Sequence, residues 1–233
     1  MSTTTLDSWY PVTKDFGIIQ ADADTAARAL VEWHNEIGIH YKVESVRGDL
    51  NTTLSRLQPL SASKLRKLFI PTASAWCVFF QSGIDGSDPS PVMSQLALRL
   101  EVLAMRLCST PPRAPYPATI WEVYAPASLG GRQPRGHRRS LAASKDGSRW
   151  AWVTSGEPFP FEEVQRYDLP RIPARLDRAL LKEYVEQFGF RAFDEAHLLT
   201  EGAILLDRLT PTRHTEEYNL DEVVAGKPWI RGR

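Results

Sequence analysis

Apolar residues recur at helical spacing in three long stretches of the chain. In the first, Ala26, Leu30, Trp33 and Ile37 fall on a single stripe, and a broader apolar face runs over residues 90–108. A third stripe runs over residues 173–188. The spacing predicts one helix for each stretch, with shorter helices beginning at Asp49 and over residues 194–199.

Helix-capping residues stand at the ends of these stretches. Asp22 or Asp24 can cap the first helix, and Gly38 supplies the left-handed residue that ends it. Ser90 precedes a proline, which is the usual order at the start of a helix, and Gly189 follows the third stripe.

Between the helical stretches, short β-rich runs alternate or form apolar blocks. The strands we predict are residues 39–46, 67–70, 75–81, 119–125, 139–143, 149–154 and 203–206. Asp146 and Gly147 suit a tight hairpin turn between the fifth and sixth of them. Because there is no regular strand–helix–strand alternation, we predict an α+β fold with a mostly antiparallel sheet and helices packed on one side.

Length and composition favour one domain with a peripheral tail. The chain has 233 residues and is 42% hydrophobic, which is enough to fill one large core. Residues 1–209 carry all the predicted elements, so we predict a single domain there. Residues 210–233 are polar apart from isolated aromatics such as Tyr218 and Trp229, and we predict a C-terminal arm held by these anchors.

Charge and cysteine content narrow the function classes. Twenty-eight basic residues balance 28 acidic ones, whereas a dedicated nucleic-acid binder usually carries an excess of positive charge. No secretory signal and no run of about 18 apolar residues is present, so we expect a cytoplasmic protein without a membrane span. Cys77 and Cys108 lie in apolar surroundings, which favours buried free thiols over a disulfide.

The familiar catalytic and cofactor motifs are missing or incomplete. The five histidines match no metal-binding spacing, and no phosphate-binding glycine motif occurs, so we expect no metal and no cofactor. Ser61 and Lys64 fit the Ser-x-x-Lys pattern of penicillin-binding enzymes, but neither companion motif is present. We interpret Ser61 as a helix cap.

The most distinctive local feature is residues 130–139, which we call the arginine loop. It contains Arg132, Arg135, His137, Arg138 and Arg139, three glycines and no acidic residue. One interpretation is a solvated hairpin loop. The other is a binding surface, since arginine forks pair with carboxylates or phosphates. The neutral chain favours an acidic protein partner over a nucleic acid.

Trp150 and Trp152 point to the same side of one predicted strand, with Trp121 and Tyr124 on a neighbouring strand. Aromatic residues of this kind form cross-strand core pairs, or they anchor protein interfaces. We include Trp150 and Trp152, together with the five residues of the arginine loop, in the predicted partner-binding surface.

An acidic stretch directly after the tryptophan strand offers the main catalytic alternative. Glu157, Glu162 and Glu163 could form an acid–base pair, in a small hydrolase or transferase that also uses His137. Nothing in the sequence places two of these carboxylates opposite each other. A third alternative is nucleic-acid binding through the arginine loop.

The region from about residue 75 to residue 190 contains, in order, the apolar strands, the tryptophan hairpin, Phe161 and Glu162, Tyr167, Arg175 and a further helix. In this general pattern it resembles uncharacterised bacterial immunity proteins of polymorphic toxin systems. The resemblance implies a non-enzymatic bacterial protein that binds and neutralises one cognate toxin. Neither the identity of that partner nor the oligomeric state follows from the sequence.

Overall fold

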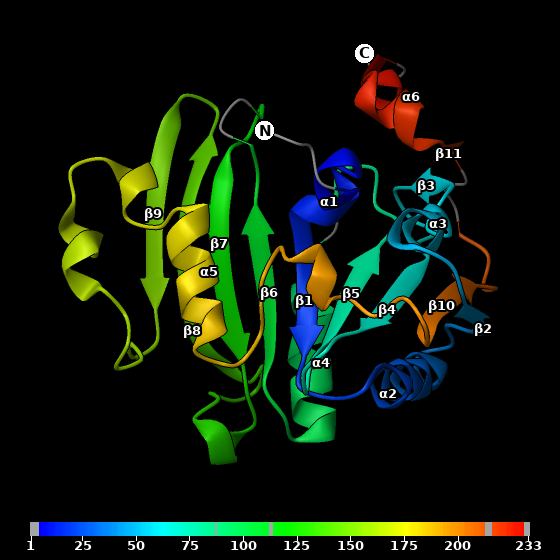
Figure 1. The fold of residues 1–233 in the computed structure, drawn as a ribbon, viewed down its shortest axis with the longest axis horizontal. Helices are drawn as coiled ribbons and strands as arrows, with labels where there is room; N and C mark the ends of the chain where they lie inside the picture. The colour runs from blue at the N-terminus through cyan, green and yellow to red at the C-terminus, as the bar shows by residue number, and fades with distance from the viewer. Residues whose placement is uncertain (1–4, 87, 112–113, 213–215, 231–233) are drawn as a thin grey trace. The chain divides into compact units, whose positions relative to one another are not determined.

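The computed structural model describes residues 5–86, 88–111, 114–212 and 216–230 (Figure 1). The chain forms two compact units. The described residues of unit 1 fall within 1–16, 21–89 and 195–233, and those of unit 2 within 17–20 and 90–194. Nine strands belong to the large sheet: β2-β10-β4-β5 in unit 1, β6-β7-β8-β9 in unit 2, and β1 (Asp15–Ile19), whose residues divide between the units.

Unit 1 pairs its four long strands antiparallel. They are β2 (Tyr41–Val46), β10 (Ala203–Arg208), β4 (Lys67–Pro71) and β5 (Cys77–Gln81). Helix α2 (Ala23–Glu36) packs on this sheet, and Asp22 caps it by accepting a hydrogen bond from the Thr25 N–H. The smaller elements are α1 (Thr5–Ser8), η1 (Val12–Lys14), α3 (Leu50–Ser55), β3 (Leu60–Ser61) and η5 (Glu195–His197).

The described C-terminal residues of unit 1 include short secondary-structure elements. They form β11 (Glu217–Tyr218), α6 (Leu220–Val224) and α7 (Lys227–Ile230). Strand β11 pairs with β3, and Tyr218, one of the two predicted anchors, is buried. The side chain of Trp229, the other predicted anchor, lies outside the described residues. The division into one domain and an arm stays a prediction.

Unit 2 is built on the antiparallel strands β6 (Ala104–Ser109), β7 (Ala118–Tyr124), β8 (His137–Asp146) and β9 (Arg149–Ser155). The turn between β8 and β9 contains Gly147 at a φ of 58°, which confirms the predicted hairpin. Its helical elements are α4 (Ser90–Leu100), η2 (Ala127–Leu129), η3 (Val164–Asp168), η4 (Ile172–Ala174) and α5 (Arg178–Glu186).

The α+β class and the mostly antiparallel sheet are confirmed, but the helices of unit 2 cover both faces of its strands. Trp121 of β7 contacts Tyr184 of α5, with ring centroids 5.5 Å apart. Its neighbour Glu122 accepts a hydrogen bond from Ser90 of α4. Successive residues of a strand point to opposite faces, so α4 and α5 lie on opposite sides (Figure 1). In this unit, one helix therefore packs on each face of the strands.

Two predicted helices are shorter than their apolar patterns. The helix predicted over residues 90–108 ends at Leu100. Glu101 adopts a φ of 55°, and residues 104–109 form strand β6 instead of a continued helix. The apolar pattern of residues 104–109 is compatible with a strand as well as with a helix. The segment forms a strand because its six consecutive residues pair with β7. The second begins at Arg178 rather than Pro173, because Asp177 caps it there by accepting from the Leu180 N–H.

Candidate functional site

The arginine loop is held in one shape by its glycines and its backbone hydrogen bonds. Gly131 lies so close to Ala125 that an added Cβ would stand 1.7 Å from the Ala125 carbonyl oxygen. The Ala125 N–H donates to Gly136 O at 2.7 Å, and the Arg132 N–H donates to His137 O at 2.9 Å. The loop is therefore a small closed hairpin rather than a loose connection.

Two arginines project from this hairpin. Arg132 and Arg135 are exposed, and neither forms an ion pair with any residue that the structure describes. The Ser94 hydroxyl of α4 donates to the Arg135 carbonyl oxygen at 2.7 Å, which ties the tip of the loop to the helix. The two guanidinium groups are thus free cations on a fixed backbone.

Arg138 and His137 are half-buried at the base of the loop. The Arg138 guanidinium lies 4.6 Å from the centre of the Phe159 ring and donates to the Glu157 carbonyl oxygen at 2.9 Å. Burial lowers the pKa of His137 below its ordinary value, while nearby Glu122 acts in the opposite direction. These two residues support the loop more than they extend its surface.

Arg139, which the sequence analysis placed on the binding surface, is buried in the structure. Its side chain is 1% exposed and bonds to the Glu162 carboxylate at 2.6 to 3.1 Å. Its Nη1 also donates to Thr154 Oγ1 and to the carbonyl oxygens of Ser155 and Gly156. The guanidinium is committed to fastening residues 154–162 onto β8, so it cannot contact a partner.

The same network includes Glu162, a residue of the predicted catalytic alternative. Its carboxylate accepts from Arg139, from the Tyr167 hydroxyl at 2.5 Å and from the Phe159 N–H at 2.8 Å. Burial, followed by the bond to Glu162, raises the pKa of Tyr167. Both carboxylate oxygens of Glu162 are therefore occupied by hydrogen-bond donors of the protein itself.

The two tryptophans of the predicted surface stand at different distances from the arginine loop. Trp150 pairs with Lys145, which is eight residues beyond His137 along β8, or about 26 Å at ~3.3 Å per residue. Trp152 is half-buried against Tyr167, with ring centroids 5.2 Å apart, and the Arg175 guanidinium lies 5.9 Å from the centre of the Trp152 ring. The predicted surface therefore does not form one patch.

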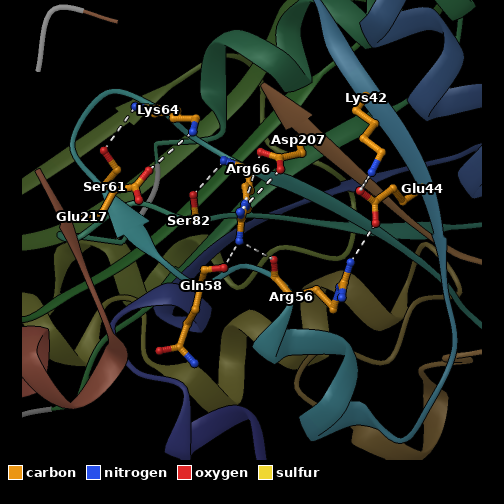
Figure 2. Close-up of polar contacts among 10 residues, drawn as sticks. All are labelled: Lys42, Glu44, Arg56, Gln58, Ser61, Lys64, Arg66, Ser82, Asp207 and Glu217. Carbon is orange, nitrogen blue, oxygen red and sulfur yellow. Dashed lines mark hydrogen bonds and ion pairs between the residues drawn. The ribbon is translucent and has the colours of Figure 1, made fainter. Parts of the chain in front are cut away.

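Ser61 and Lys64 show no catalytic arrangement (Figure 2). The Ser61 hydroxyl oxygen accepts from the backbone N–H groups of Ser63 and Lys64 at 3.3 Å, so it caps a turn after β3 instead of a helix. The Lys64 ammonium lies 3.6 Å from Glu217. The lysine is paired elsewhere and is not placed to activate the serine.

A groove of about 310 Å³ lies in unit 1 between α2 and the strands β2 and β10. Its floor is apolar, with Val43 and Ile204, and its wall carries Asp24 and Arg28, which pair with each other at 2.9 Å. Among the described residues, no group of three or more histidines, cysteines or acids could hold a metal ion, in this groove or elsewhere. No described helix has the length and apolar character needed to cross a bilayer.

No motif in the sequence points to Lys67, Arg208 or Tyr41, which the structure brings together with His34 in unit 1. One signal was present: Lys67 alternates with Phe69 on a strand, which places its ammonium on a core face. The partnership with Arg208 depends on strand pairing and had no local signal.

No protein-family model, curated protein or solved structure matches the chain, so comparison with known proteins assigns no function to these residues.

Proposed function

We propose that this chain is a non-enzymatic protein-binding protein that docks an acidic surface of its partner on the arginine loop. The observation that carries the proposal is the pair of exposed guanidinium groups of Arg132 and Arg135 on a closed hairpin, neither of which forms an ion pair with a described residue. Arginine is enriched at interface hot spots because its planar fork binds carboxylates at two points.

The fixed backbone of the loop favours tight binding. Ordering a flexible loop on association costs free energy, and a loop that is already closed avoids most of that cost. The charge balance of 28 basic and 28 acidic residues favours a protein as the binding partner over a nucleic acid, because a protein that binds the phosphate backbone of a duplex usually presents a large basic surface.

Neutralisation of a cognate toxin in the bacterial cytoplasm is the specific form of this function that we propose. It rests on the resemblance to immunity proteins and on the lack of a catalytic arrangement at Glu162 and Ser61 among the described residues. A neutralising protein must stay bound at low cellular concentrations, which requires a Kd near 1 nM or below, about −12 kcal/mol.

The test begins with partner capture from the native host and continues with loop variants. Arg132→Ala and Arg135→Ala should each weaken binding of the captured protein by more than ~1 kcal/mol, mainly through faster dissociation. Arg47→Ala, which removes an exposed arginine of unit 1, is the matched control and should bind as the wild type does. Co-expression with the captured protein should then relieve its toxicity, and the double variant should not.

Three results would overturn the proposal. One is capture of no stoichiometric protein, and another is unchanged affinity in the Arg132→Ala, Arg135→Ala double variant. The third is RNA or DNA binding that falls steeply with salt and depends on the same arginines, which would assign the loop to nucleic acid.

A further inference from the structure

Unit 1 contains two cationic side chains on the face of the sheet that α2 covers. Lys67 of β4 pairs with Leu206 of β10, so Arg208, two residues further along β10, is its diagonal neighbour on the same face. Tyr41 of β2 lies directly opposite Arg208. We call Lys67, Arg208, Tyr41 and the α2 residue His34 the basic cluster.

Lys67 and Arg208 have more N–H donors than the described hydrogen-bond acceptors that they contact. Lys67 is 5% exposed, and its ammonium, which has three N–H donors, bonds to one described acceptor, Gln81 Oε1 at 2.7 Å. Arg208 Nη1 donates to Ser63 O at 3.3 Å, while its Nε is buried and has no hydrogen-bond partner among the described residues. A buried donor without an acceptor costs free energy.

No carboxylate among the described residues compensates the basic cluster. On the opposite face of the same strands, Arg66 is neutralised by Asp207 at 3.3 and 3.4 Å (Figure 2). On the α2 face, burial and then Arg208 lower the pKa of Lys67 to about 7. The pKa of His34 falls to about 4 through burial and the charges of Lys67 and Arg208. The charged groups that act on both residues are cations.

The neutral members of the cluster do not supply the missing negative charge. His34 Nδ1 lies 2.8 Å from the Tyr41 hydroxyl, so these two residues satisfy each other. Burial raises the pKa of Tyr41 to about 12, which keeps it uncharged at neutral pH. Arg208 and Tyr41 are partly buried and Lys67 is buried, so the cluster extends from the core of unit 1 toward its surface.

We propose that the basic cluster is a binding site for a phosphate group, held between the free N–H donors of Lys67 and the Nε of Arg208. A phosphate dianion matches two cations in charge and offers several acceptor oxygens, whereas one carboxylate would leave a net positive charge in the interior. The site lies in unit 1, and it is independent of the arginine loop of unit 2.

The test titrates inorganic phosphate at pH 7 against potassium chloride of equal ionic strength, with thermal unfolding and calorimetry as readouts. We expect a saturable rise in Tm with phosphate, because a ligand that binds the folded state stabilises it. Arg208→Gln should weaken binding at least tenfold. Arg47→Gln removes one exposed positive charge from the same unit and should change the affinity less than twofold. A parallel titration with O-phosphoserine distinguishes free phosphate from a phosphoryl group on a larger molecule.

Lys67→Met provides a second and independent test. It should abolish the effect of phosphate and raise Tm in phosphate-free buffer, because it removes a buried charge that has no counter-charge. A purely structural lysine would show the opposite change in Tm. The proposal is overturned if neither phosphate compound stabilises the wild type beyond potassium chloride, or if Arg208→Gln binds phosphate as the wild type does.

Discussion

At the scale of single residues, Arg139 and Arg132 show how differently two arginines of one segment behave. Arg139 is buried and bonded to Glu162, whereas Arg132 is exposed and unpaired among the described residues. Arg139→Ala should lower the free energy of unfolding by about 3–5 kcal/mol, because it leaves the Glu162 carboxylate buried without its partner. Urea denaturation measures the loss.

The control for this prediction is Arg132→Ala, which should change stability by no more than about 0.5 kcal/mol. Replacing both members of the pair, with Arg139→Met and Glu162→Leu, should recover most of the loss, since no unpaired charge remains. Equal small effects of Arg139→Ala and Arg132→Ala would show that the ion pair does not hold residues 154–162 on the strand.

At the scale of elements, each of the two cysteines lies within a strand of the large sheet, β5 or β6. Cys77 is fully buried in β5, and Cys108 is 4% exposed in β6. Burial, together with the charge of Asp22, raises the pKa of Cys77 and so suppresses its reactive thiolate. Both thiols should react with a labelling reagent only as fast as the protein unfolds.

A cysteine placed in the exposed β8–β9 turn, Ser148→Cys, is the matched control and should be labelled at once. Labelling of Cys108 at that same rate in native protein would contradict the burial of β6, and with it the strand that replaces the predicted end of the helix.

At the scale of the whole molecule, the buried bases of unit 1 give stability a pH dependence of definite sign. The pKa of Lys67 is about 7 in the folded state and 10.5 ordinarily, so above pH 7 the unfolded chain binds one more proton. Stability should therefore rise with pH from about 7 to 8.5, by up to ~1.4 kcal/mol per pH unit. His34, with a pKa of about 4 against 6.5, adds a rise of the same sign between pH 4 and 6.5.

Urea titrations at a series of pH values measure both slopes. Above about pH 8.5 the buried thiol of Cys77 opposes the trend, because an unfolded cysteine loses its proton there. Lys67→Met should flatten the upper slope and leave the lower one. A wild-type stability that falls between pH 7 and 8.5 would rule out a depressed pKa at Lys67.

The sequence by itself determined those features that depend on neighbours along the chain. Asp22 and Asp49 cap helices, Gly38 adopts the positive φ that follows the first of them, and Gly147 makes the hairpin turn. These signals are local, because a cap or a turn is satisfied by groups within a few residues. Together they were sufficient for the α+β class and the antiparallel hairpin.

Only the tertiary structure decided which charges are buried and which surfaces are contiguous. Pairing with β7 turns residues 104–109 into a strand, and Glu162, 23 residues away, draws Arg139 inward. The meeting of Lys67 and Arg208 depends on the pairing of β4 with β10. Strand pairing joins segments that are distant along the chain, and the burial it produces sets the cost of each charge, so no local pattern could reveal it.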